Sequence, residues 1–261
     1  FVGRGDASFS TDNLESLIRE IQKKGIKKIE GNLILNKSYF GKIPNSIDFD
    51  DDPMRAYNVL PNAISIQSNT INFKFKPQNN NVKIEAKPDL KYLKIKNNLR
   101  LSQKNCVSWK QALDYQKANS IQEEMIIFQG HLSKKCSNKE IDLSVIDNGR
   151  YFYEVFKYLW VQNGGNFSGG YWVNNNERLE GKLIASHLSR PLGVLIRDMN
   201  KYSLNLMARN LMLTVIAEDL KKQVTEDDVN HFVLDWLSNQ GIANDNIFIE
   251  NGAGLSRKTY I

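Results

Sequence analysis

The stretch from Ser203 to Leu220 constrains the fold more than any other part of this chain, because it is apolar on nearly every side. A surface helix carries its apolar residues on one face, so a helix that is apolar all round has to be enclosed by other elements. The large apolar residues of this stretch are Leu204, Leu206, Met207, Leu211, Met212, Leu213, Val215 and Ile216. The sequence therefore predicts a helix over 203–220 that is buried inside a domain.

Other segments have the apolar spacing of helices with one buried face. Residues 11–24 form such a pattern, which Thr11 or Asp12 could cap and which Gly25 could end. Pro191 suits the first position of a helix, since its missing N–H would have no partner there. The further predicted helices are 151–162, 191–200 and 225–239.

The apolar pattern between Ala63 and Gln103 has a different period, with apolar residues mostly at every second position. Breaks rich in Asn and Pro, such as Pro77–Asn81, separate the runs, which is typical of short strands. We predict a loop over 105–119 with a helical turn at 109–115. Further strands are predicted at 28–35, 124–131, 140–145, 169–173, 182–188 and 247–249.

The pattern changes from β-rich to α-rich near Asp147, and this is the domain boundary that the sequence favours. We expect an α+β protein in which 1–146 forms an α/β and β-rich part, with a β-rich subdomain at about 63–135. Residues 147–261 are expected to form a second domain.

Composition limits the kinds of partner. The net charge of +6 comes from lysines spread along the chain, without a basic stripe of interleaved aromatics, so we expect no nucleic-acid partner. This charge is compatible with attraction to an anionic polymer. No apolar run reaches the roughly 18 residues of a membrane span.

The three histidines and two cysteines do not have metal-ligand spacing, so we expect no metal or cofactor. Cys106 and Cys136 could be buried free thiols or, in an exported protein, a disulfide.

Two short segments could carry chemistry. Ser203-Leu204-Asn205 offers a hydroxyl that could pass a proton to a leaving amine and an amide that could bind a substrate peptide. The alternative is a serine that only caps a helix. Asn251–Arg257 has the sequence of a glycine turn, and its alternative interpretation is a tight structural loop in which Gly252 or Gly254 takes a positive φ.

Taken together, five blocks resemble the D-alanyl-D-alanine carboxypeptidase/endopeptidase family, the class C or type-4 low-molecular-mass penicillin-binding proteins. They occur in the family's order and span nearly the whole chain. The blocks are Gly5–Ser8, Gly25–Leu33, Tyr57–Ala63, Arg197–Asn205 with its Ser-x-Asn motif, and Asn251–Arg257.

The resemblance implies part of a β-lactamase/transpeptidase-like domain over 147–261, with inserted β-rich sequence over 1–146. In this family the Ser-x-Asn serine relays a proton and its asparagine binds the substrate amide, and these roles fall on Ser203 and Asn205. The family's acylated serine and lysine base (Ser-x-x-Lys) and its Lys-Thr-Gly strand have no counterpart in the sequence. We therefore expect the nucleophile before Phe1 and the third motif after Ile261.

The function implied by the resemblance is that of a periplasmic serine hydrolase. It would cleave D-Ala-D-Ala ends or cross-links of peptidoglycan peptides through an acyl-enzyme, would be inhibited by beta-lactams and would need no cofactor. The alternative is a non-catalytic peptidoglycan-binding or scaffold protein. Because the chain resembles exported enzymes, Cys106 and Cys136 are predicted to form a disulfide.

Overall fold

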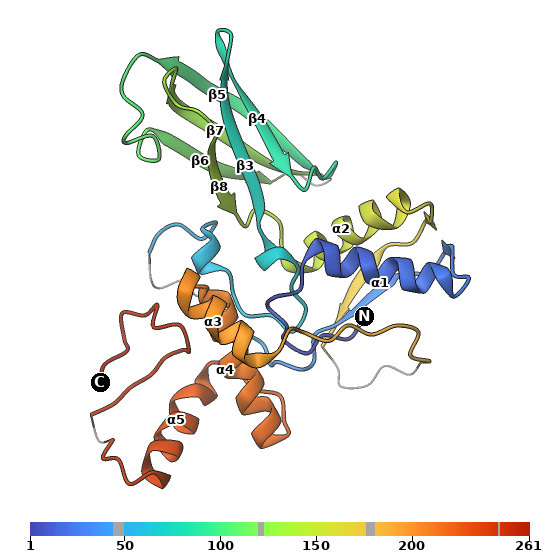
Figure 1. Ribbon diagram of the computed structural model, residues 1–261, viewed down its shortest axis with the longest axis vertical. Coiled ribbons are helices and arrows are strands. Elements are labelled where there is room, and N and C mark those ends of the chain that lie inside the picture. Colours follow the sequence, from blue (N-terminus) through green and yellow to red (C-terminus); the bar gives the residue numbers. More distant parts are fainter. Residues whose placement is uncertain (44–49, 120–122, 176–180, 245) are drawn as a thin grey trace. The chain divides into compact units, whose positions relative to one another are not determined.

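The computed structural model describes residues 1–43, 50–119, 123–175, 181–244 and 246–261. The chain divides into two compact units (Figure 1). The first unit combines Phe1–Asn69 with Asn148–Ile261, and the second unit is the intervening Thr70–Asp147.

The second unit contains two three-stranded sheets. In one, β3 (Ile71–Gln78) lies between β4 (Asn81–Lys87) and β8 (Lys139–Leu143), and both pairings are antiparallel. In the other sheet, β7 (Glu124–Ser133) lies between β5 (Leu93–Ser102), to which it is parallel, and β6 (Leu113–Asn119), to which it is antiparallel.

Aromatic rings from both sheets form the core of the second unit. Phe73 and Phe75 on β3 each meet Phe128 on β7 edge to face, with ring centroids 5.0 and 5.1 Å apart. The every-second-residue pattern therefore points into the space between the sheets, as a half-buried strand requires. The predicted loop over 105–119 and its helical turn at 109–115 are both wrong beyond Ala112, because Leu113 begins β6 and its side chain is buried there.

A disulfide joins Cys106, in the connection between β5 and β6, to Cys136, which follows β7. The predicted pairing is thereby confirmed. The bridge ties together two chain segments that are 30 residues apart in sequence.

The first unit is formed by the two parts of the chain that come before and after the second unit in the sequence. Strand β2 (Leu33–Asn36) pairs in parallel with β10 (Tyr171–Asn174), and β1 (Lys28–Ile29) pairs in parallel with β9 (Asn166–Phe167). Residues 1–69 thus belong with 148–261, and the predicted segment 1–146 does not form one compact unit. The predicted single strand at 28–35 is two strands, β1 and β2.

Helices α1 (Thr11–Lys23) and α2 (Asn148–Gln162) contact each other, and α2 also contacts β9 and β10. The cap of α1 is Ser10 rather than Thr11 or Asp12. The Ser10 hydroxyl accepts a hydrogen bond from the Asn13 backbone at 3.2 Å, and the Asn13 side chain accepts one from the Ser10 backbone at 2.9 Å. This reciprocal pair satisfies backbone donors at both residues.

The remaining helices are α3 (Leu192–Tyr202), α4 (Asn205–Leu220) and α5 (Asp227–Asn239), together with the short 3₁₀ helices η1 (Ala56–Asn58) and η2 (Gln67–Asn69). Pro191 precedes α3 instead of opening it, and α5 starts two residues after Thr225. The predicted burial of α4 is confirmed for one face, where Leu213 and Ile216 are fully enclosed in a cluster with Phe40 and Val224. It is wrong for Val215 and Leu220, which are 47 and 43% exposed.

Two predicted strands are wrong. Residues 182–188 form no strand, and Leu183 and Leu188 are largely exposed, so their alternation has no partner strand to pair with. Residues 247–249 contribute only a bridge between Phe248 and Tyr260. In the part of the chain that the structure describes, no helix combines the length and apolarity needed to cross a bilayer.

Candidate functional site at the junction of two helices

Ser203 and Asn205 lie where α3 passes into α4. Ser203 ends α3 in a left-handed conformation (φ 52°, ψ 52°), and Asn205 is the first residue of α4. The predicted helix start at Ser203 is therefore two residues too early. A left-handed conformation is uncommon for a residue other than glycine and costs roughly 1 kcal/mol.

The serine is not the cap of α4. Leu204 occupies the cap position, and no side chain caps that end of the helix. Ser203 is exposed and Asn205 is partly exposed, and neither side chain is bonded to another residue within the described part of the chain. The hydroxyl and the amide are thus available to a ligand, and the simple capping alternative for Ser203 is wrong.

One turn beyond this junction, α4 is fastened to the N-terminal segment through Asn210. Its side chain is fully buried, and its amide nitrogen donates to the backbone oxygens of Gly5 at 3.2 Å and Asn62 at 3.1 Å. Its amide oxygen accepts from the Asn62 backbone at 3.2 Å. A buried amide with this many partners fixes the backbone around it.

The neighbouring Arg209 adds a charged connection. Its guanidinium donates to both carboxylate oxygens of Glu226 at 2.6 and 2.8 Å and to the Val59 backbone oxygen at 3.3 Å. Both charged side chains are mostly buried, at 11 and 18% exposure. This fork-shaped contact is a strong and directional kind of ion pair, and it connects α4 with the segment before α5.

The glycine loop packs on the same part of α4. A Cβ placed on Gly252 would lie 2.9 Å from the Ala208 backbone oxygen and 2.7 Å from the Met212 Cβ, so only glycine fits. Asn251 braces the loop by accepting from the Ala253 backbone at 2.9 Å. Gly254 has a φ of +69°. The structural interpretation of this turn is therefore correct for Gly254, whereas Gly252 is required for its close approach to the helix.

A cavity of about 750 Å³ runs beside α4, but neither Ser203 nor Asn205 lines it. It is bordered by residues 4–8, by part of 187–195, and by α4 residues that include Met207 and Leu211. This cavity therefore gives no support to a cleft shared by Ser203 and Asn205. Behind them on α4, Leu206 and Met207 are buried and Leu211 is partly buried.

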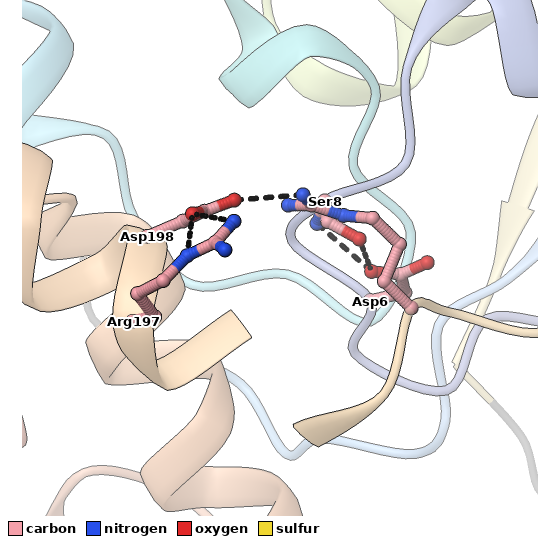
Figure 2. A network of polar contacts seen from close by, with 5 residues as sticks. Asp6, Ser8, Arg197 and Asp198 are labelled. Carbon is pink, nitrogen blue, oxygen red and sulfur yellow. Dashed lines mark hydrogen bonds and ion pairs between the residues drawn. The ribbon is translucent and has the colours of Figure 1, made fainter. Parts of the chain in front are cut away.

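The cavity is also lined by three polar side chains, Asp6, Ser8 and His187. The sequence did not predict that these three residues lie together. Ser8 donates to Asp6 Oδ1 from its hydroxyl at 2.6 Å and its backbone at 2.8 Å (Figure 2). His187 Nε2 lies 3.7 Å from the other Asp6 oxygen. The carboxylate stands between serine and histidine, so the imidazole is not placed to take the serine proton as in a catalytic triad.

Asp198 ties the segment before α3 to that helix (Figure 2). It accepts a hydrogen bond from Arg190 at 2.7 Å and two from Arg197 at 3.0 and 2.9 Å. The bond from Arg190, followed by those from Arg197, holds the pKa of Asp198 below its usual range. This network lies five residues before Ser203 and fixes residue 190 against α3.

The model of the D-Ala-D-Ala carboxypeptidase 3 (S13) family matches residues 1–261. The chain belongs to this family. Its α+β class is confirmed, and its fold matches part of the solved penicillin-binding protein 4 structures, which combine a transpeptidase-like domain with an inserted domain. The family identification made from the sequence blocks is therefore correct.

The chain is 26% identical to the D-alanyl-D-alanine carboxypeptidase DacB of Haemophilus influenzae, over 98% of its own length and 53% of that protein. It thus spans about half the length of this curated relative. The crystal structure of penicillin-binding protein 4 (dacB) from Haemophilus influenzae matches 98% of the chain and 56% of that structure, with a TM-score of 0.82 and 24% identity. A second structure of that protein, complexed with a beta-lactam, matches with a TM-score of 0.73 and 23% identity.

Proposed function

We propose that the protein containing this chain is a serine-type D-Ala-D-Ala carboxypeptidase/endopeptidase. It would be exported to the periplasm, act on peptidoglycan stem peptides through an acyl-enzyme, and be inhibited by beta-lactams. Membership in the carboxypeptidase family over every residue of the chain is the observation that carries this proposal. The beta-lactam complex of a relative with the same fold supports its inhibitor class.

Two local features support the proposed roles. Ser203 would relay the proton to the leaving amine, which requires a hydroxyl that is not used in capping. Asn205 would hold the substrate amide, to which its side chain can both donate and accept. Because no serine here is followed three residues later by lysine, the acylated serine and its base would come from residues outside these 261.

The test is the rate at which the full-length protein is acylated by a fluorescent penicillin. Ser203→Ala should slow acylation by roughly 10²–10⁴-fold, as expected for the loss of a proton-transfer group. Ser137→Ala, an exposed serine of the other unit, is the matched control and should leave the rate unchanged. The 261 residues alone should not be labelled.

Other outcomes separate the alternatives. A Ser203→Ala protein that is acylated as fast as the control would remove the relay role. A folded full-length protein that is never labelled, yet binds isolated peptidoglycan, would favour the non-catalytic alternative. A labelled serine within the 261 residues would show that the nucleophile has been assigned to the wrong part of the protein.

A further inference from the structure

Although lysines are spread along the whole chain, its net positive charge comes from one unit. Thr70–Asp147 holds 14 lysines and arginines and eight aspartates and glutamates, which gives +6. The chain total of 35 basic and 29 acidic residues leaves 21 of each in the other unit, whose net charge is zero. The surplus is therefore a property of the β-rich unit alone.

Within this unit the surplus gathers at the end that carries the disulfide. The two segments joined there, residues 100–113 and 131–139, contain no aspartate or glutamate. Their cations are Arg100, Lys104, Lys110, Lys134, Lys135 and Lys139, and all except Lys139 are exposed. We call this group the disulfide-end cluster.

Several contacts hold the two segments of this cluster side by side. Arg100 stands opposite His131 in the parallel ladder of β5 and β7. The Lys134 backbone donates to the Ser102 backbone oxygen at 2.9 Å, and the Ser133 hydroxyl donates to the Lys104 backbone oxygen. The disulfide adds a covalent link beyond the end of the ladder. The cations are thus carried on a braced part of the unit.

The cluster differs in its pairing from several other lysines of the unit. On the first sheet, Lys74 contacts Glu140 at 2.9 Å and Lys76 contacts Glu85 at 2.7 Å. None of the six cluster cations makes an ion pair with any carboxylate that the structure describes. The Lys135 ammonium contacts the side-chain oxygen of Asn105 at 3.5 Å, and Lys110 lies over the Trp109 ring at 5.8 Å.

One of the two segments also carries an exposed apolar residue. Val107 follows Cys106 directly and is 90% exposed, between Lys104 and Lys110 in the chain. A soluble polyanion gains nothing from an apolar residue at this place. A bilayer of anionic lipids offers phosphates to the lysines and an apolar boundary to the valine.

We propose that the disulfide-end cluster of the β-rich unit is a docking surface for the headgroups of an anionic lipid bilayer. Five of the six cations are lysines, which act as point charges without demanding the bidentate geometry that arginine favours. This suits attachment to a fluid surface better than recognition of one molecule. The proposal rests on the β-rich unit alone and is independent of the proposed hydrolase activity.

The experiment measures how much of the 261-residue chain sediments with vesicles. Vesicles of equal parts phosphatidylglycerol and phosphatidylcholine should bind the chain, and vesicles of phosphatidylcholine alone should not. Binding should weaken as salt is raised, because the ionic atmosphere screens exposed charges. Equal binding to both kinds of vesicle would overturn the proposal.

Charge variants locate the surface. Replacing Lys134 and Lys135 together by Gln should weaken binding more than ten-fold, since each cation near an anionic surface contributes about five-fold. The matched control replaces Lys87 and Lys91 by Gln. Both are exposed and lie near the start of β5, roughly 30 Å along the strand from the disulfide end. This control variant removes the same charge as the Lys134 and Lys135 variant. It should weaken binding by no more than about two-fold, because distant charges attract the vesicle only weakly through the salt solution.

Val107→Ser separates a bilayer from a soluble polyanion. It should weaken vesicle binding about two-fold or more, since it removes a small apolar group from the contact, and it should leave binding to soluble polyphosphate unchanged. Equal losses in the two charge variants would overturn the location. Binding to polyphosphate with none to anionic vesicles would assign the surface to a soluble polymer and overturn the lipid proposal.

Discussion

Asn210 is the residue on which the position of α4 depends most directly. Its amide group serves backbone atoms of Gly5 and Asn62 from a fully buried site. Both segments lie more than 140 residues earlier in the chain. A substitution that preserves the size of this side chain but removes its donors tests the role of the hydrogen bonds by themselves.

Asn210→Asp should lower the free energy of unfolding by about 3 kcal/mol, because an oxygen would then face two backbone oxygens in a buried site. Asn98→Asp, at an exposed position on β5, is the control and should change stability by less than about 0.5 kcal/mol. Urea unfolding followed by circular dichroism measures both. Equal midpoints for the two variants would contradict the role of Asn210.

Asp198 makes stability depend on pH. Its pKa is lowered in the folded protein, first by the hydrogen bond from Arg190 and next by those from Arg197. The folded state therefore binds the proton less readily than the unfolded chain. The stability so gained is present above the unfolded pKa of about 3.9 and is lost as pH falls through the folded pKa.

Asp198→Asn should accordingly flatten the dependence of stability on pH below about pH 5, while lowering stability at neutral pH. The measurement is the urea midpoint of the variant and the natural chain at several pH values. Arg190→Gln should reproduce part of the effect, because it removes the largest cause of the lowered pKa. Parallel curves for all three proteins would show that this carboxylate does not contribute.

At the scale of elements, α4 is held by segments that come from distant parts of the sequence. The blocks around Gly5, Asn62 and Gly252 all meet it between Ala208 and Met212. Because these contacts hold α4 in place, they also fix its first residue, Asn205, and the adjoining Ser203. This explains why a short polar motif is followed by such an apolar helix.

Three glycines near these helices should respond differently to alanine. Gly252→Ala should cost about 1–3 kcal/mol, because its Cβ would collide with the Ala208 backbone and Met212. Gly254→Ala should cost about 1–2 kcal/mol, because its φ is +69°. Gly193→Ala has open space inside α3 and should stabilise by about 0.5–1 kcal/mol.

Thermal unfolding of the three variants measures this order. The important comparison is between Gly252 and Gly193. Neither has a positive φ, and a new Cβ would meet packed atoms at Gly252 but open space at Gly193. A Gly252→Ala protein as stable as Gly193→Ala would mean that the glycine loop does not pack closely on α4.

At the scale of the whole molecule, the chain consists of one unit interrupted by another. The inserted unit has its own aromatic core, its own disulfide and the entire net charge. Removing the bridge should therefore weaken that unit without changing the contacts around α4.

Replacing Cys106 and Cys136 together by Ser should destabilise the β-rich unit by about 3.5 kcal/mol, the value expected for closing a loop of this length. Hydrogen exchange followed by mass spectrometry should show faster exchange in 70–147 and unchanged exchange in α4. Faster exchange throughout 148–261 as well would show that the two units do not unfold separately.

Sequence by itself determined what depends on local pattern or on recognisable blocks. The apolar composition of α4 predicted burial, which holds for the face that carries Leu213 and Ile216, and the alternation of 71–75 predicted a strand with one buried face. The blocks identified the family, and the cysteine pair in that context predicted the disulfide. Each of these properties is fixed by side-chain chemistry within a short stretch.

Tertiary structure decided what depends on distant partners. Residues 182–188 alternate like a strand but have no strand to pair with, whereas β2 finds its partner in β10, across the inserted unit. Ser203 lies within an unbroken apolar pattern, yet its backbone turns left-handed between two helices. A strand or a helix break is stabilised by contacts made elsewhere in the chain, and local periodicity carries no information about those contacts.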